Sequence, residues 1–404
     1  MKENIGKLHD CYGCGVCTAA CPVNIIQLRE NKRGFYEPVI ISEDKCIECG
    51  LCLKVCAFNN SGLALKEGSP ECMAGWSENA IIRQRCSSGG IGFEIGKQLI
   101  EKGYKACGVR YDIGKERAEH FISATVDDFT PTIGSKYIQS FTEDAFRAIK
   151  KNDRYFVTGT PCQIDSFRRY LQMTKREDNF ILMDFFCHGV PTMLLWRKYL
   201  HEVEKKIGKA KFVAWRNKTG GWQDSWDINI DPEQVGNVDW HNSYNINILE
   251  KKHFYQSRWK GGDLFYRFFL GNYCLNKCCY KSCKYKELAS SADIRIGDLW
   301  GRKFKNDNKG TSAVIALTQR GKDIISGLKG CTFEGVDAGT ATEGQMPHSP
   351  SLPLIYNKVI EELGSDKSLE EINGSTIKRY RLLTIPKRAI NRLCYMLNLK
   401  PILH

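Results

Sequence analysis

Two cysteine runs near the start of the chain constrain its fold more than any other feature. The segments "CYGCGVCTAACP" and "CIECGLCLKVCA" share the spacing C-x2-C-x2-C-x3-C, with Ala57 in the second run where the first has proline. A loop with this spacing wraps three thiolates around one iron–sulfur cube, while the fourth thiolate reaches a second cube. The runs therefore predict a small domain that holds two 4Fe–4S clusters.

Two-cluster bacterial ferredoxins have this pattern, which divides the eight cysteines into two sets. Structural zinc is the alternative, but zinc sites use paired cysteines rather than triplets with a distant fourth. One cluster is assigned to what we call the first cysteine group: Cys11, Cys14, Cys17 and Cys56. The other is assigned to the second cysteine group: Cys46, Cys49, Cys52 and Cys21.

The length of 404 residues is enough for roughly two or three domains. No apolar run approaches the ~20 residues that span a bilayer, and the first residues lack the apolar core of a signal peptide. We therefore expect a cytoplasmic protein, in which disulfides are rare. Most of the 19 cysteines are then expected to bind metal rather than to pair with one another.

The formal net charge of +13 indicates anionic partners. Because we find no nucleic-acid-binding motif, we expect an acidic redox protein or a partner oxidoreductase subunit, and no nucleic acid. Residues 346–404 are predicted to form a basic helical C-terminal extension, with helices near 354–364 and 386–399. The second helix would either make a peripheral membrane contact or dock on its own domain, and we favour docking.

Two similar strand–turn–helix units lie in the middle of the chain. The segments "RYFVTGTPCQIDSFRRYL" and "NFILMDFFCHGVPTMLLWRKYL" each begin with an apolar strand and continue through a turn into a helix. Such strands are typical of a parallel sheet, in which ligands bind at the carboxyl ends of the strands. The predicted fold is an α+β ferredoxin-like dicluster module, residues 1–65, followed by an α/β domain with a largely parallel or mixed sheet, residues 72–345.

Cys162 and Cys187 lie at the carboxyl ends of these two strands, and four further cysteines occur in "CLNKCCYKSC" at 274–283. Together they predict a third 4Fe–4S cluster, with Cys274 and Cys278 as reserve ligands. Zinc at the 274–283 run is one alternative, and a catalytic Cys162 next to His188 is another. The preferred ligands form the third cysteine group: Cys162, Cys187, Cys279 and Cys283.

Other motifs are candidates for cofactor binding. The turn at residues 87–90 precedes a predicted helix, where backbone amides and the helix dipole suit a phosphate, although a plain capped turn has the same pattern. In "GSKYIQS", Lys136 and Tyr137 would hold a phosphate or a ring, or form a surface turn. In "SADIRIGDLWG", Asp298 would bind a ribityl hydroxyl or cap a turn. The segment "WRNKTGGW", 215–222, would face a flat anionic cofactor or merely pack.

The motifs "SSGG", "GSKYIQS", "GTPCQI", "FCHGVP" and "ADIRIGDLWG", in this order behind a two-cluster module, resemble the coenzyme F(420) hydrogenase/dehydrogenase beta-subunit family. The resemblance extends from about residue 8 to about residue 345. The form "FCHGVP" resembles bacterial members that are often associated with surface-polysaccharide gene sets. The run "KCCYKSC" is one residue longer than the C-Y-x-C of the relatives, which leaves two ligands of the third cluster open.

The resemblance implies an FAD in the second domain, beside a 4Fe–4S cluster. The flavin would exchange a hydride with a small organic molecule, a deazaflavin or a polysaccharide precursor, and single electrons with the clusters. His188 is the candidate proton carrier. Candidate cofactor contacts are Ser87, Ser88, Gly89, Gly90, Lys136, Tyr137, Gly159, Thr160, Pro161, Gln163 and Asp298. The alternatives are a non-catalytic electron-relay subunit and a binding or assembly protein in polysaccharide production.

Overall fold

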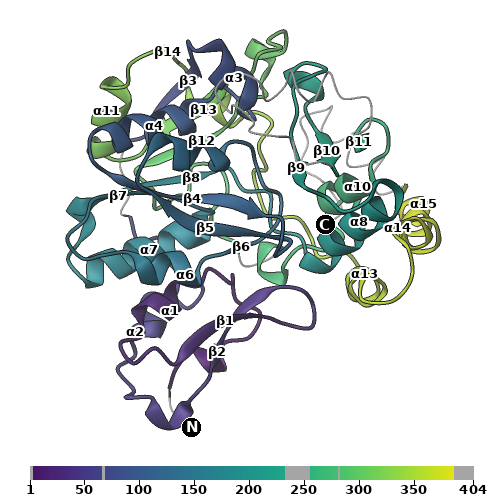
Figure 1. Ribbon diagram of the computed structural model, residues 1–404, viewed down its shortest axis with the longest axis horizontal. Coiled ribbons are helices and arrows are strands. Elements are labelled where there is room, and N and C mark those ends of the chain that lie inside the picture. The colour runs from purple at the N-terminus through teal and green to yellow at the C-terminus, as the bar shows by residue number, and fades with distance from the viewer. Residues whose placement is uncertain (1–2, 66–68, 233–254, 281–282, 386–404) are drawn as a thin grey trace.

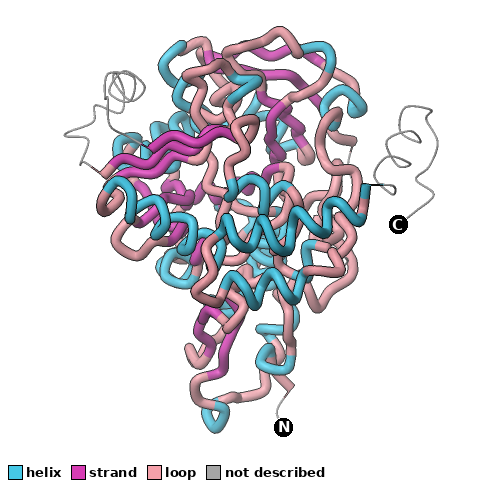
Figure 2. The backbone as a smooth tube through the Cα atoms, turned by 90° about the vertical axis from the view of Figure 1, so that its right-hand side faces the viewer, coloured by secondary structure: helices cyan, strands magenta, loops and turns pink. Residues whose placement is uncertain are grey.

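The chain forms a large body and a smaller N-terminal lobe, which extends from the body at the bottom of Figure 1 and again in the perpendicular view of Figure 2. The computed structural model describes residues 3–65, 69–232, 255–280 and 283–385. Within these ranges the strands form sheets of two, three and nine strands. The predicted fold class, a ferredoxin-like lobe followed by an α/β domain with a mixed sheet and a helical C-terminal segment, is confirmed.

The lobe repeats one local arrangement. Its elements are η1 (Ile5–Lys7), α1 (Val16–Ala20), β1 (Ile26–Glu30), β2 (Tyr36–Ile40), η2 (Glu43–Lys45) and α2 (Leu51–Lys54). Gly15 precedes α1 and Gly50 precedes α2, with φ angles of 74° and 68°. Glycine adopts this left-handed conformation without the steric penalty of a Cβ atom. Each cysteine run can therefore turn sharply into a short helix, and the antiparallel pair β1–β2 separates the two runs in the sequence.

A nine-stranded sheet is the centre of the body. Its strands are β3 (Glu71–Ser77), β4 (Lys105–Asp112), β5 (Arg117–Ser123), β6 (Ser140–Phe141), β7 (Tyr155–Thr158), β8 (Phe180–Phe185), β12 (Ile294–Asp298), β13 (Ser312–Ala316) and β14 (Cys331–Gly335). They lie in the order β14–β3–β13–β12–β8–β7–β4–β5–β6. The neighbours β12, β8, β7 and β4 are parallel, and β13 and β5 join this group antiparallel. The apolar strands β7 and β8 are largely buried, as central parallel strands should be.

Helices cover both faces of this sheet (Figure 1). Around it lie α3 (Ala80–Arg85), α4 (Ile91–Glu101), α5 (Val126–Phe129), η3 (Thr130–Thr132), α6 (Glu143–Ala148), α7 (Pro161–Met173), η4 (Glu177–Asn179), η7 (Arg302–Phe304), α11 (Gln319–Ser326) and α12 (Ala338–Thr342). Phe156 of β7 shares a hydrophobic cluster with Ile95 of α4, whereas the next residue, Val157, shares another with Phe167 of α7. Because successive strand residues point to opposite faces, α4 and α7 lie on opposite sides of the sheet.

A second part of the body contains a small sheet and the C-terminal helices. Its elements are α8 (Met193–Ile207), β9 (Phe212–Ala214), η5 (Trp222–Asp224), β10 (Asp227–Asp231), β11 (Tyr255–Arg258), α10 (Leu264–Leu270), η6 (Lys277–Cys279), α13 (Tyr356–Leu363), α14 (Leu369–Ile372), the π-helix η8 (Asn373–Lys378) and α15 (Arg379–Leu383). None of the described helices is long and apolar enough to cross a membrane. The helix expected near 354–364 is α13, and the one expected at 386–399 lies outside the described residues.

The described part of the segment after residue 345 packs on the body. Val359 and Leu363 of α13 belong to the same hydrophobic cluster as Trp196 and Leu200 of α8, and all four side chains are buried. The apolar side of α13 thus completes the core next to α8. The described part of the segment is therefore integral to the body.

The lobe is likewise joined closely to the body. The Leu28 amide donates to Glu143 Oε2 at 2.6 Å, and the Tyr36 amide donates to Gln139 Oε1 at 2.9 Å. Val16 of α1 is buried in the hydrophobic cluster that contains α7. Residues 3–65 therefore share both hydrogen bonds and core with the sheet domain, although the sequence suggested a self-contained module.

Candidate functional site

The first cysteine group surrounds one small internal cavity. Its four thiols line this cavity together with Tyr12 and Phe58. Burial raises the pKa of Cys11 to about 12, and negative charge on Cys14 or Cys56 would raise it further. Burial likewise raises the pKa of Cys56 to about 11. Four thiols that face one enclosed space and interact electrostatically are a suitable donor set for a cluster, since cluster iron takes four thiolates.

The second cysteine group lies farther from the body. The thiols of Cys21 and Cys49 are close enough to Cys52 to raise its pKa, although burial is the larger cause. Cys46 accepts a hydrogen bond from Asn4 Nδ2 at 3.8 Å, and Cys49 is exposed. The structure thus brings Cys56 to the first run and Cys21 to the second, the crossed arrangement that the spacing predicted.

The third cysteine group assembles at the carboxyl ends of neighbouring strands. Cys162 is the second residue of α7, directly after β7, and Cys187 follows β8 by two residues. Burial raises the pKa of Cys162 well above its ordinary range, and Cys187 and Cys279 add to this rise. Burial also raises the pKa of Cys279 to about 12, with Cys187 and Cys283 contributing. The four thiols are therefore mutually close, as a shared cluster would require.

Of the two reserve cysteines, Cys274 lies apart from these four, whereas Cys278 shares a buried cluster with Cys162 and Cys283. Cys274 is completely buried in the hydrophobic cluster around α8 and α10, and its carbonyl accepts from the Thr192 amide at 2.9 Å. Its environment is that of a packed apolar side chain, so the structure argues against Cys274 as a ligand. The Cys278 thiol donates a hydrogen bond to the carbonyl of Asp10 in the lobe. Cys278 therefore connects the lobe and body beside the third group.

Tyr12 lies between the first and third groups. Besides lining the cavity of the first group, its side chain belongs to a buried cluster with Cys162, Cys278 and Cys283. Its ring packs edge-on against Phe58, with ring centroids 5.4 Å apart. The sequence showed Tyr12 only as a spacer within the first run. A single aromatic layer therefore separates two cysteine groups that are far apart in the sequence.

A cavity of about 600 Å³ opens beside the third group, at the carboxyl ends of β7, β8 and β12. This volume lies within the range of small-molecule and cofactor sites. Most of the predicted cofactor contacts line it: Ser87, Ser88, Gly90, Lys136, Tyr137, Gly159, Thr160, Gln163 and Asp298. The predicted cluster ligand Cys187 and the predicted proton carrier His188 line it as well. Trp259 and Phe185 also line it and are 39% and 40% exposed, so solvent reaches the cavity here.

Three predicted residues do not line this cavity. A Cβ atom on Gly89 would come within 2.3 Å of the Gly75 carbonyl oxygen, so Gly89 allows the turn to pack against β3. Pro161 is the first residue of α7, where its fixed φ angle favours helix initiation. The Cys162 thiol lies among the other cysteines rather than at the cavity. The structure therefore gives these residues packing roles or, for Cys162, a place in the third group instead of a catalytic one.

Lys136 has a different role from the predicted one. Its ammonium donates to the carbonyls of Pro131, Thr132 and Ile133 at 2.9–3.1 Å. Burial lowers the pKa of Lys136 to about 7. These three acceptors use all three N–H donors of the ammonium group, so Lys136 closes the η3 turn and its side chain does not present free donors to a phosphate.

A buried ionic and aromatic network supports one wall of the cavity. Arg216 donates to Asp298 Oδ2 at 3.0 Å and to the Tyr137 hydroxyl at 3.1 Å. Trp222 stacks on Trp300 with ring centroids 4.8 Å apart, and its Nε1 donates to Asp298 at 3.4 Å. The 215–222 segment is thus an internal support, not a surface. Asp298 and Tyr137 are held in fixed orientations at the cavity.

His188 is neutral and fixed. Its Nε2 lies 2.7 Å from Asn272 Oδ1, and its ring packs edge-on against Phe269 with centroids 4.9 Å apart. Burial lowers the pKa of His188 to about 4, and the positive charge of Lys286 also lowers it. Since the amide oxygen of Asn272 can only accept, this contact fits a tautomer that carries the proton on Nε2.

Lys286 connects the third cysteine group with the cavity. Its ammonium donates to the Cys187 carbonyl at 2.8 Å and to the His188 carbonyl at 3.3 Å, and it lines the cavity. Burial raises the pKa of Cys187 to about 11, and the charge of Lys286 opposes this rise. No sequence pattern indicated this role, since a lysine close to a cysteine run usually lies on the surface.

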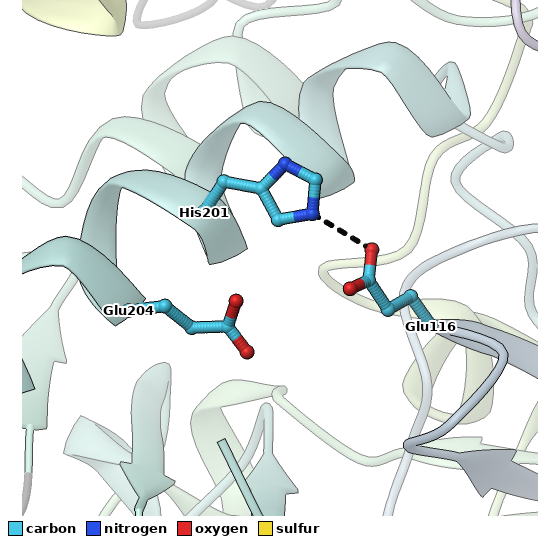
Figure 3. Close-up of side chains that lie close together, drawn as sticks. All are labelled: Glu116, His201 and Glu204. Atoms are coloured by element: carbon cyan, nitrogen blue, oxygen red, sulfur yellow. Dashed lines mark hydrogen bonds and ion pairs between the residues drawn. The ribbon is translucent and has the colours of Figure 1, made fainter. Parts of the chain in front are cut away.

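A separate group of possible metal ligands lies away from the cavity. Glu116, His201 and Glu204 bring their ligand atoms within 4.8 Å of one another, and His201 Nε2 lies 2.9 Å from Glu116 (Figure 3). However, Lys209 donates to Glu116 at 2.8 Å and to Glu204 at 3.0 Å. Because this ammonium already balances the two carboxylates, the group is a surface ion-pair network.

Comparison with known proteins relates the chain to one family and one domain type. Residues 152–333 match the family model for the C terminus of the coenzyme F(420) hydrogenase/dehydrogenase beta subunit, and residues 10–60 match the 4Fe-4S dicluster domain. An uncharacterized protein of Methanocaldococcus jannaschii is 24% identical over 220 residues. The match covers 46% of this chain and 58% of that protein, so the chain spans little more than half of this relative's length. A chain of the F(420)-reducing NiFe hydrogenase complex from Methanosarcina barkeri gives a TM-score of 0.44 at 16% identity, over 80% of this chain and 96% of that chain.

Proposed function

We propose that the chain, whose residues 152–333 match the coenzyme F(420) hydrogenase/dehydrogenase beta-subunit family and whose residues 10–60 match a 4Fe-4S dicluster domain, is a flavin-dependent oxidoreductase. As an iron–sulfur redox protein, it passes single electrons through the lobe. In the proposal, a third 4Fe–4S cluster takes these electrons to FAD in the cavity. A bound flavin supplies the conversion between two one-electron transfers and one hydride transfer to an organic molecule.

The observation that carries the proposal is the position of Cys187. This residue belongs to the third cysteine group and also lines the cavity of about 600 Å³. A cluster on the third group would therefore border any cofactor in the cavity. Tyr12 would separate that cluster from the one on the first group by a single aromatic side chain. Electrons would then follow a continuous route from the lobe to the cavity.

The cavity walls suggest how FAD would lie. The N-terminal end of α4, with Gly90 and Gly92 at the cavity, offers backbone amides to the pyrophosphate. These amides would take the phosphate-binding role that the sequence suggested for Lys136, because the donors of the Lys136 ammonium are already used. Asp298, held by Arg216, is placed to accept a hydrogen bond from a ribityl hydroxyl. The flavin ring would then lie near Gly159 and the third group.

The substrate would enter beside the partly exposed aromatic residues. Phe185 and Trp259 line the cavity and reach solvent, and Trp226 and Phe269 line it as well. Aromatic walls favour a flat ring, because stacked rings gain from both burial and quadrupole interactions. A ring-bearing hydride carrier such as a deazaflavin therefore fits this opening better than a polysaccharide precursor does.

The second cysteine group is the proposed contact with a partner oxidoreductase subunit. Cys49 is exposed, and the neighbouring Ile47 is 61% exposed. Glu43, Asp44 and Glu48 are exposed around it, together with one exposed cation, Lys45. These carboxylates favour a partner with a basic surface, whereas the net charge of the whole chain suggested an acidic one.

The state of His188 favours a second candidate function, an electron-relay subunit without a substrate of its own. A neutral imidazole that is bonded to Asn272 is a poor proton donor. In this case the flavin would only store electrons for a partner. The loaded protein would bleach a redox dye but would not turn over any small molecule, whereas the enzyme would oxidise or reduce a deazaflavin.

Metal and flavin analysis tests the main proposal. Protein reconstituted without oxygen is expected to hold about twelve irons and roughly one FAD per chain. Cys162→Ala should lower the iron content to about eight and leave the clusters of the lobe intact. Cys331→Ala is the matched control, because Cys331 lies on β14 away from all three groups. A Cys162→Ala protein with full iron content, or a wild-type protein without FAD, would contradict the proposal.

A further inference from the structure

The segment after Cys283 places two lysines on opposite sides of a buried tyrosine. Tyr285 is 3% exposed and lies in the cluster that contains Tyr12 and Cys162. Lys284 and Lys286 flank it in the sequence and direct their ammonium groups to different parts of the molecule. The lysines can therefore act on different cysteine groups, although only one residue separates them.

Lys284 lies beside the first cysteine group. Its ammonium donates to the carbonyls of Ala57, Asn60 and Gly62 at 3.1, 2.6 and 2.7 Å. Ala57 directly follows Cys56, so this positive charge lies next to a thiol of the first group. Lys284 also lies 3.4 Å from a carboxylate oxygen of the buried Asp165.

Lys286 lies beside the third cysteine group. It donates to the carbonyls of Cys187 and His188, at 2.8 and 3.3 Å, and borders the cavity. Across the described residues we find no ion pair between Lys286 and a carboxylate. The charge of Lys286 is therefore less compensated than that of Lys284.

The buried rings of Tyr12 and Tyr285 lie between the environment of Lys284 and that of Lys286. The ring of Tyr285 lies 5.8 Å from that of Tyr12, centroid to centroid, and its hydroxyl donates to Asp165 at 2.8 Å. The two aromatic rings thus form a buried layer between the lysines. Each charge acts most strongly on the cysteines on its own side, because Coulomb energy falls with distance.

We propose that Lys284 and Lys286 set the reduction potentials of two different clusters, Lys284 that of the first group and Lys286 that of the third. Reduction adds one negative charge to a cluster, and a nearby ammonium stabilises the reduced form and raises the potential. Lys286 has the larger effect, because Asp165 offsets part of the charge of Lys284. The part concerning Lys286 rests on the proposed function, since it requires a cluster on the third group.

The test is a redox titration of the full-length reconstituted protein, followed by electron paramagnetic resonance of each cluster. Lys286→Met should shift the potential of the third cluster to more negative values and leave the first unchanged. Lys284→Met should shift the first cluster by a smaller amount and leave the third unchanged. Lys286→Arg and Lys284→Arg keep the charge and should restore the wild-type potentials, which a purely structural role would not predict.

The outcomes separate the failure of this inference from that of the proposed function. If all three clusters form but both methionine variants shift the same cluster, or neither shifts any, the assignment of the lysines is overturned. If wild-type protein holds only the two lobe clusters, the proposed third cluster fails and the Lys286 assignment fails with it, while Lys284 is still tested on the first. If Lys284→Met does not fold, Lys284→Gln retains a donor without the charge and gives the same comparison.

Discussion

The first and second cysteine groups arise from the same repeated spacing but lie in contrasting surroundings. Cys14 donates to the Ser166 hydroxyl of α7 at 3.3 Å, and the same hydroxyl accepts from the Ala57 amide at 3.0 Å. In the second group Cys46 accepts a hydrogen bond from Asn4 of the lobe, and Cys49 is exposed. In the proposed function one motif would therefore serve two tasks: the first group would transfer electrons within the molecule, and the second group, through its exposed Cys49, would exchange them with a partner.

The largest expected effect is a loss of folding stability when the contacts that attach the first cysteine group to the body are removed. Asp165 is completely buried and accepts from the Ala64 amide at 2.6 Å and from the Tyr285 hydroxyl at 2.8 Å. Asp165→Ala should lower the free energy of unfolding by about 3–5 kcal/mol, because it leaves buried donors and cations without their acceptor. Urea unfolding measures this loss. Asp178→Ala, at an exposed ion pair, should change stability by less than about 0.5 kcal/mol and is the control.

A smaller loss of folding stability should appear when pH is lowered. The buried His120 lies on the side of the sheet that packs against the lobe. His120 packs against Phe146 of α6, and burial lowers its pKa to about 4. Its neutral form is favoured in the folded state, so this contribution is complete above the unfolded pKa of about 6.5 and decreases as pH falls toward 4. Between pH 7.5 and 5 the loss should be roughly 2 kcal/mol.

His120→Asn should remove this part of the pH dependence, measured as the difference between wild type and variant in urea unfolding at the two pH values. His348→Asn is the control, because His348 is exposed. An equal slope in wild type and His120→Asn would show that the pKa of His120 is the same in the folded and unfolded states, which contradicts the prediction.

Air exposure should distinguish the two copies directly. The second group is nearer to solvent than the first, and access of solvent and oxygen governs the loss of iron from a cluster. We expect iron to be lost in two phases, the second-group cluster on the order of tenfold faster than the first. Iron release to a coloured chelator, with spectra of each cluster, measures the two rates. A single phase would remove the distinction between buried and exposed copies.

The smallest effect on stability is expected for a substitution beside the exposed Cys49 of the second cysteine group. Ile47 is 61% exposed, so Ile47→Asp should change the free energy of unfolding by less than about 0.5 kcal/mol. The same change should slow reduction of the protein by an electron-donating protein, because it puts a charge into an apolar contact surface. Stopped-flow reduction by a donor protein and by dithionite measures this. Slower reduction by dithionite as well would indicate damage to the cluster rather than to docking.

Short-range regularities made much of this arrangement predictable. Cys56 meets the first run because the spacing leaves little freedom to a short loop. Cys162 and Cys187 lie together because they end neighbouring parallel strands, and the cavity opens there for the same reason. These inferences needed only local geometry and the topology of a parallel sheet.

The errors concern contacts that local sequence does not specify. Lys136 resembled a phosphate ligand, but its donors are taken by the preceding turn. Cys274 and Cys279 lie in the same run, yet only Cys279 faces the third group, because η6 turns the chain between them. The sequence left open whether the 215–222 segment faces a cofactor or packs, and the structure buries Arg216 against Asp298. Each of these positions depends on which distant segment covers the side chain.

The shared core between lobe and body has a consequence for how electrons move. Val16 of the lobe is buried together with Phe146 and Phe167 of the body, so the lobe cannot swing away without exposing apolar surface. Many multi-domain redox proteins instead tether a mobile carrier whose diffusion limits the rate. In this chain internal transfer needs no such search, and its speed should not depend on the viscosity of the medium.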